Sequence, residues 1–370
     1  MKQQQSSGLA EPQPLKKVPE RSSLLVGSLP FSNEEACMTR ALDALASSLF
    51  CLPDGEIGEK SPAFPQGNRI AWVVYAIEKI TADPTNWKIV KQPVRGLDGM
   101  ATDYDHFQKL KPLRSPAEMP DYVKLGYDDF FRSSYPIFRR LREERNLPHL
   151  KFQLGVPTGF AMGFAFASQL QWIRYTYAFN TVIAREVNAA LDEAGNDVIV
   201  QLEVPPELYA AYMLPKPLMG WALKPIQDLL SKINPAQIGI HLCLGDYHNH
   251  ALVHPKHLGK MVAFSNKLVD EWPIQHKLAY IHYPLAEGLV PPPADAAFYN
   301  PLKNVRLPAE TRFIAGFVHE KRTLEENRQL RDRIEAIRGQ LIDISTSCGL
   351  GRRTPETAEK LLGYLAELVQ

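Results

Sequence analysis

The amino-acid sequence predicts an α/β protein in which eight parallel strands form a (β/α)8 barrel, the TIM-barrel architecture. Eight short apolar segments of strand length occur along the 370 residues, and most of them precede a segment with helical spacing. Strands that alternate with helices pair in parallel, because each return to the same edge of the sheet requires a crossover. The apolar runs are nearly continuous, which is typical of strands buried on both faces. No G-x-G-x-x-G or P-loop follows an early strand, which disfavours the alternative, an open doubly wound sheet.

The first expected elements lie close to the N-terminus. Residues 23–30, SLLVGSLP, form an apolar run that ends at a proline and predict a buried strand. Residues 33–45 have helical spacing, with Asn33 or the preceding serine as the N-cap. Residues 49–52 predict the second strand, which stops at the turn PDGE.

Residues 57–125 interrupt this alternation. The segment contains proline-rich loops and predicts one helix at 69–80 and one hairpin strand near 87–94. We interpret it as a long insertion after the second strand and not as a second domain. Residues 21–370 are thus expected to form a single barrel domain, preceded by a polar lead-in, residues 1–20, that we expect to be disordered.

Regular alternation of strands and helices resumes after the insertion. Strands are predicted at residues 151–157, 197–204, 237–244, 277–283, 312–318 and 341–347. Helices are predicted at residues 126–146, 175–194, 218–233, 257–270, 324–339 and 354–369. Prolines follow several of the apolar runs, and they mark where strands stop because proline cannot continue a central ladder.

Composition and charge argue against several classes of partner. Lys and Arg number 42 against 41 Asp and Glu, so there is no electrostatic reason to expect nucleic acid or an anionic membrane. No apolar stretch reaches the roughly 18–20 residues that span a bilayer, and the polar N-terminus lacks the apolar core of a signal peptide. Four cysteines in this length argue against a disulfide scaffold. We therefore expect a cytoplasmic protein with small-molecule partners.

Chemically reactive residues are concentrated where the predicted strands end, which is where the active site of such a barrel lies. In chain order they are Ser28, Glu56, Thr158, Glu203, His241, Cys243, His282, His319 and Cys348. In the pattern His241-Leu242-Cys243, alternate residues of a strand point the same way, so the imidazole and the thiol face one point. Two thiolates with one or two imidazoles suit zinc. The expected metal ligands are His241, Cys243 and Cys348, with His282 as the fourth.

Each of these residues also has a simpler interpretation. A buried cysteine commonly serves as a small hydrophobe, and we interpret Cys37 and Cys51 in that way. A single histidine near a strand end is usually a hydrogen-bonded structural residue. Glu56 and Glu203 could bond only to backbone or to a basic neighbour. His-x-Cys is a weak motif alone, and its joint placement with Cys348 is what favours a metal site.

Several pieces of the sequence recur in one known family. They are Val26-Gly27-Ser28, Asp54-Gly55-Glu56, QLEVP at 201–205, HLC at 241–243, Val318-His319, and SCGL at 347–350 followed by Arg352. With these pieces the chain resembles the C-terminal barrel of cobalamin-independent methionine synthase, within the superfamily that includes uroporphyrinogen decarboxylase. The resemblance runs from about residue 24 to the C-terminus and is thin over the insertion.

The resemblance implies a role for each matching residue. The positions of the family's zinc ligands are occupied by His241, Cys243 and Cys348. The residues that hold the amino-acid part of the thiol substrate correspond to Ser28 and Glu56, with Glu203 as an acidic residue of the same pocket. His319 takes the place of the histidine proposed as proton donor to the leaving group.

The chain also departs from the family. The family usually has a glutamate as fourth ligand at the end of the sixth strand, where this chain has His282, and the change implies a His2Cys2 set. The tryptophan near which the family stacks folate is replaced by the stretch GVPTGF at 155–160, which leaves folate binding open. Full-length members contain a second barrel, and this chain resembles a stand-alone core.

The function expected from these residues is zinc-dependent methyl or alkyl transfer to a small-molecule thiol. Coordination to zinc removes the proton of a thiol and leaves a nucleophilic sulfur. The sequence identifies neither the thiol nor the methyl donor. Two alternatives remain: another enzyme of the superfamily, such as a metal-free decarboxylase or a C–S or C–C lyase, and a non-catalytic small-molecule-binding relative.

Overall fold

The structure is a computed structural model that describes residues 20–62, 64, 67–70, 72–96, 101–245 and 247–370. The lead-in expected to be disordered, residues 1–20, lies outside the described residues except for Glu20. Within the described part of the chain, no helix combines the length and the apolar character needed to cross a membrane.

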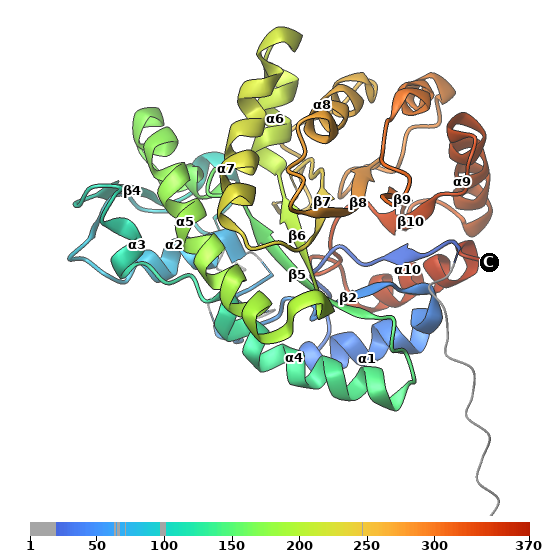
Figure 1. The fold of residues 1–370 in the computed structure, drawn as a ribbon, viewed down its shortest axis with the longest axis horizontal. Coiled ribbons are helices and arrows are strands. Elements are labelled where there is room, and N and C mark those ends of the chain that lie inside the picture. The colour runs from blue at the N-terminus through green and yellow to red at the C-terminus, as the bar shows by residue number, and fades with distance from the viewer. Residues whose placement is uncertain (1–19, 63, 65–66, 71, 97–100, 246) are drawn as a thin grey trace, which may run out of the picture.

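Eight parallel strands form a nearly closed barrel, which confirms the predicted fold (Figure 1). The strands are β1 (Ser23–Leu24), β2 (Cys51–Pro53), β5 (Lys151–Pro157), β6 (Val198–Glu203), β7 (Gln237–His241), β8 (Lys277–Pro284), β9 (Arg312–Val318) and β10 (Asp343–Thr346). Their order in the sheet is β1-β10-β9-β8-β7-β6-β5-β2. A parallel bridge between Ser23 and Leu49 joins the two edges.

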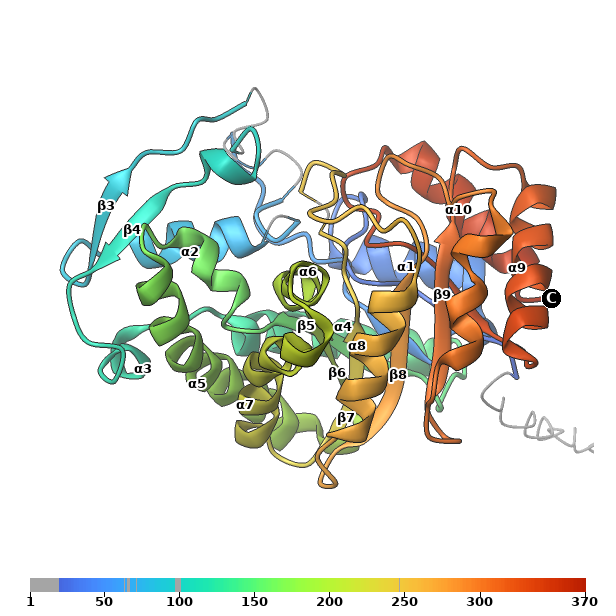
Figure 2. The ribbon, with the colours of Figure 1, turned by 90° about the horizontal axis from the view of Figure 1, so that it is seen from above.

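Helices cover the outside of the barrel (Figure 2). They are α1 (Glu34–Leu45), α4 (Tyr127–Glu144), α5 (Gln169–Ala194), α6 (Pro205–Met213), α7 (Lys224–Lys232), α8 (Gly259–Asp270), α9 (Leu324–Arg338) and α10 (Pro355–Leu368). The start of α1 follows the predicted cap, because the Asn33 side chain accepts a hydrogen bond from the Ala36 amide. Helix α6 was not predicted, and it begins directly after β6 at a pair of prolines.

The first strand is much shorter than predicted. Residues 25–30 are not part of the ladder although most of them are buried. Their backbone is bound by side chains instead: the Gln153 amide donates to the carbonyls of Leu25 and Val26 at 3.1 and 2.8 Å, and the Gln201 amide donates to Val26 at 2.6 Å. Buried carbonyls require such partners, so the two glutamines replace the missing strand pairing.

The segment between β2 and α4 forms an extension at one side of the barrel (Figure 2). It contains α2 (Trp72–Thr81), β3 (Trp87–Lys91), β4 (Lys109–Pro112) and α3 (Met119–Tyr122), and β3 pairs with β4 in an antiparallel hairpin. The helix and the first hairpin strand were predicted, whereas the second strand was not. Trp87 anchors the hairpin, since its buried ring stacks on Phe179 of α5 at 6.4 Å.

The barrel interior is layered along its axis. An apolar cluster occupies one layer and consists of Leu24, Phe50, Cys51, Ile199, Ala279, Tyr280 and Ile314. On β6, Ile199 belongs to this cluster, and Gln201 and Glu203 follow on the same face because strand side chains alternate. The interior therefore changes from apolar to polar toward the carboxyl ends of the strands, where the site residues lie.

Candidate metal centre

Three side chains from two strand ends converge at the mouth of the barrel. His241 is the last residue of β7, Cys243 lies two residues farther, and Cys348 follows β10. One nitrogen or sulfur atom of each lies within 4.8 Å of the other two, and no fourth His, Cys, Asp or Glu of the described chain belongs to this group. The structure thus brings together residues that are 105 positions apart in sequence.

The separations within this group fit a single zinc ion. The Sγ atoms of Cys243 and Cys348 are 4.0 Å apart, and Cys348 Sγ is 3.6 Å from His241 Nε2. With Zn–S bonds of about 2.3 Å and Zn–N bonds of about 2.0–2.1 Å, a tetrahedral ion separates two sulfurs by roughly 3.8 Å and a sulfur from a nitrogen by roughly 3.6 Å. These two separations are close to the tetrahedral values, and all three ligand atoms lie within 4.8 Å of one another, so the group could hold one zinc ion.

The backbone geometry at Cys243 differs from the prediction. The strand was expected to continue to residue 244, but β7 ends at His241 and the Cys243 amide donates to the His241 carbonyl at 2.9 Å. The two side chains meet through this tight turn and not through strand alternation. The Gly245 amide also donates to Cys243 Sγ at 3.4 Å, a contact that stabilises a thiolate.

His282 occupies a position behind His241. Its Nε2 is 3.0 Å from the Thr346 carbonyl, which can only accept, so Nε2 carries a proton. Burial lowers the pKa of His282 to about 3, and the neutral ring then accepts through Nδ1 from His241 Nδ1 at 2.7 Å. His241 is consequently left with its lone pair on Nε2, the atom that faces Cys348.

The sequence placed His282 among the ligands, and the structure does not group it with them. Both of its ring nitrogens make hydrogen bonds to protein atoms, and among the described residues the candidate ligand set consists of His241, Cys243 and Cys348. In this arrangement His282 orients His241, as residues behind a metal ligand commonly do.

Gly316 of β9 provides the space for His282, which leads to a first prediction. A Cβ at this position would lie 2.5 Å from His282 Nε2 and 2.8 Å from the Thr346 carbonyl oxygen, both closer than real contacts allow. In Gly316→Ala we expect His282 to shift and zinc affinity to fall by roughly 10- to 100-fold, measured by competition with a chelator. Gly363→Ala is the control, since nothing lies within 4 Å of its added Cβ. Equal zinc affinity in both variants would show that His282 does not orient His241.

Glu203 and Glu56 lie at the same end of the barrel as this group. Glu203 ends β6 and is the ladder partner of His241. Glu56 adopts a left-handed backbone conformation, with φ of 52°, after β2. A Cβ on Gly155 would lie 2.8 Å from Glu56 Oε1 and 3.5 Å from Glu203 Oε1, so the two carboxyl groups are neighbours. Burial, and then the charge of Glu203, raise the pKa of Glu56 well above its ordinary value.

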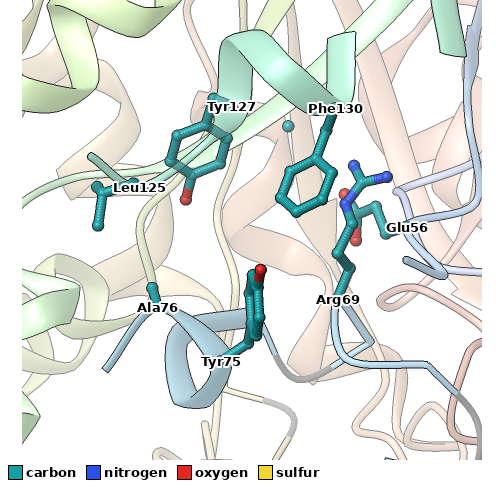
Figure 3. Close-up of a pocket in the computed structure, with 8 residues that line it drawn as sticks. Glu56, Arg69, Tyr75, Ala76, Leu125, Tyr127 and Phe130 are labelled. Atoms are coloured by element: carbon teal, nitrogen blue, oxygen red, sulfur yellow. The ribbon is translucent and has the colours of Figure 1, made fainter. Parts of the chain in front are cut away.

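A cavity extends from Glu56 under the extension, and we call it the aromatic cavity (Figure 3). It is small and is lined by Glu56, Arg69, Tyr75, Ala76, Leu125, Tyr127, Phe130 and Gly155. The sequence analysis did not single out Arg69, which binds Asp54 through two nitrogens at 2.8 and 3.3 Å. The signal was weak because Arg69 lies in the irregular insertion, 15 residues from its partner.

Ser28 and His319 lie at the same end of the barrel. Ser28 accepts a hydrogen bond from the Gly351 amide at 3.3 Å, on the loop that carries Cys348. His319 follows β9 and is fully buried. Its Nδ1 accepts from the Lys321 amide at 3.1 Å, while its Nε2 has no hydrogen-bond partner within the described chain. Burial lowers the pKa of His319, so the ring is neutral with its proton on Nε2.

No family model matches the sequence, and no curated protein matches it. Among solved structures, the fold is similar to that of a B12-independent methionine synthase from Shewanella sp. W3-18-1 in complex with selenomethionine. The TM-score is 0.57 at 13% identity, and the alignment covers 95% of this chain and 97% of that chain. At this identity the similarity establishes the shared fold.

Proposed function

We propose that this chain is a zinc-dependent methyltransferase that acts on the thiol of a small molecule. The observation that carries the proposal is the group of His241, Cys243 and Cys348, whose separations of 3.6 and 4.0 Å suit one tetrahedral ion and which has no fourth His, Cys, Asp or Glu within the described chain. When bound there, zinc lowers the pKa of a coordinated thiol and makes its sulfur nucleophilic at neutral pH. A closed four-ligand site would lack the position that a substrate needs.

The residues around this group suit an amino-acid thiol. Glu56 and Glu203 present carboxyl groups to an ammonium, and Ser28 lies beside the Cys348 loop, where it would hold the carboxylate end. The similar solved structure is of a complex with selenomethionine. Selenomethionine is an amino acid with a methylated selenium atom, so its shape is comparable to that of a methylated amino-acid thiol. By this analogy the amino-acid part of the substrate would lie between the carboxyl pair and Ser28.

The protonation states of two histidines support the same assignment. His241 offers Nε2 to the metal because its Nδ1 proton is held by His282. His319 offers its Nε2 proton to a bound molecule because Nδ1 is occupied by the Lys321 amide. We propose that His319 stabilises or protonates the group that leaves when the methyl is transferred.

A direct test follows the metal shell when a thiol is added. We expect purified protein to contain one zinc per chain, and X-ray absorption to show two sulfur ligands that become three when homocysteine is added. Product formation with candidate methyl donors would then be followed by mass spectrometry. Protein without stoichiometric zinc would contradict the proposal and favour a metal-free decarboxylase or lyase. A sulfur count that stays at two would favour a non-catalytic relative.

A further inference from the structure

The β3–β4 hairpin of the extension carries four lysines on one face, which we call the lysine face. In the antiparallel register they form two directly opposed pairs, Lys88 with Lys111 and Lys91 with Lys109. The other face of the hairpin carries Trp87 and Leu110, which are buried. Like charges directly opposite one another destabilise a sheet, so this arrangement costs stability unless an anion lies beside it.

No acidic side chain compensates the lysine face. Three of its lysines are exposed and Lys109 is half-buried, and none of the four forms an ion pair within the described chain. Lys91 and Lys109 donate instead to the backbone carbonyls of Asp105 and Phe164, at 3.3 and 2.6 Å. The nearly neutral net charge of the whole chain, from which no anionic membrane was expected, therefore conceals a local excess of positive charge.

An exposed apolar surface lies beside the hairpin, because a bridge between Leu110 and Phe166 brings β4 to the start of α5 (Figure 2). This apolar surface belongs to α5, the end of α6 and the 3-10 helix η5 (Lys216–Leu223). It consists of Leu170, Ile173, Tyr177, Met213, Leu218 and Trp221, whose exposed fractions are 40–66%. Ile173, Tyr177 and Trp221 line the same small pocket, so α5 and η5 form one continuous surface.

A chain of contacts joins the lysine face to the apolar surface. Lys109 donates to the carbonyl of Phe164, whose ring centre lies 5.2 Å from that of Trp172. The Trp172 ring lies 4.9 Å from that of Phe160, which lies 5.9 Å from that of Trp221. The positive and the apolar parts are therefore adjacent.

The charged residues of the apolar segments distinguish between possible partners. Arg174, Lys216 and Lys224 are exposed, whereas the one carboxyl group of residues 166–177 and 205–224, that of Glu207, is fully buried. A second copy of this chain would bring like charges together, which disfavours self-association. An anionic bilayer attracts the cations and accepts protruding leucine, methionine and tryptophan side chains at its interface, without needing a shaped groove.

We propose that the lysine face and the apolar surface together dock this protein on a membrane that contains anionic phospholipids. The lysines lie against the lipid phosphate groups, while Leu170, Met213 and Trp221 enter the boundary between headgroups and acyl chains. Stable docking requires both parts, because a single weak signal gives only marginal membrane binding. The inference does not rest on the proposed function, since none of these residues belongs to the candidate ligand group.

Co-sedimentation of the full chain with phosphatidylcholine vesicles, with and without phosphatidylserine, tests the proposal. We expect binding to be at least about tenfold tighter when phosphatidylserine is present. The double variants Lys88→Glu/Lys111→Glu and Leu170→Ser/Met213→Ser should each weaken that binding by at least about tenfold. Zinc content and circular dichroism on the same samples would show that the variants are folded.

Matched controls lie where β8 begins, at the opposite end of the barrel from the metal centre. Lys277 has a side chain that is 55% exposed, and Ile274 is fully exposed. Lys277→Glu and Ile274→Ser should therefore bind vesicles like the wild type. Equal binding by all variants, or no binding to anionic vesicles, would overturn the inference. Self-association that Leu170→Ser/Met213→Ser abolishes, without vesicle binding, would also overturn it and assign the apolar surface to a second copy.

Discussion

Cys348→Ser is expected to lose zinc and methyl transfer together. Its Sγ lies 4.0 Å from Cys243 Sγ and 3.6 Å from His241 Nε2, so it completes the only group of three such ligands in the described chain. A serine hydroxyl stays protonated near neutral pH and is a poor ligand compared with a thiolate. We expect zinc affinity to fall by at least about 100-fold and activity to fall below detection, since a ligand is lost outright.

The measurement is zinc content by mass spectrometry after dialysis against a weak chelator. Cys51→Ser is the matched control, because that thiol is fully buried in the barrel and contacts Gln153 Oε1 at 3.0 Å, a bond that a hydroxyl can also make. The control should retain one zinc per chain. If Cys348→Ser also retained it, the assignment of these three residues as ligands would fail.

Arg69→Met is expected to cause the largest loss of stability. Asp54 and Arg69 are 4% and 8% exposed, and Asp54 also accepts from Ser134 Oγ at 2.7 Å and from the Glu56 amide at 2.9 Å. Removing the guanidinium leaves a buried carboxylate without its compensating charge, which typically costs about 3–5 kcal/mol. Urea unfolding at pH 7 would measure it. A loss below about 1 kcal/mol would mean that water replaces the guanidinium.

The effect should depend on pH. Burial alone would raise the pKa of Asp54, but the charge and hydrogen bonds of Arg69 more than offset it, so its pKa lies below the ordinary value. The ion pair therefore stabilises the fold fully above the unfolded-state pKa of about 3.9, and its contribution is lost as pH falls through the lower folded-state pKa. The difference between wild type and Arg69→Met should shrink below pH 4. Arg140→Met, at an exposed arginine whose ion pairs with Glu35 and Glu144 lie on the surface, should change stability little at any pH.

The barrel was predictable because its signals are local. Strands such as Lys151–Pro157 and Arg312–Val318 were placed correctly to the residue, since a short apolar run closed by a turn or by proline favours a buried strand. The first strand departed most from its predicted bounds. After Leu24 its backbone carbonyls accept hydrogen bonds from the side-chain amides of Gln153 and Gln201 and not from a neighbouring strand. Because these glutamines are far away in the sequence, no local pattern predicts where the strand ends.

The sequence by itself determined the order of strands and helices and the reactive residues at their ends, because hydrophobic periodicity and turn chemistry act over a few neighbouring residues. Only the tertiary structure decided which of these residues belong to the candidate ligand group and which support a member of that group. His241 ends β7, and His282 is its ladder partner two residues before the end of β8. One of them faces Cys348, and the other hydrogen-bonds to the first on its far side. The register of separate strands and the space beside Gly316 decide which of the two imidazoles lies with Cys243 and Cys348. Both are properties of the packing and cannot be inferred from either strand alone.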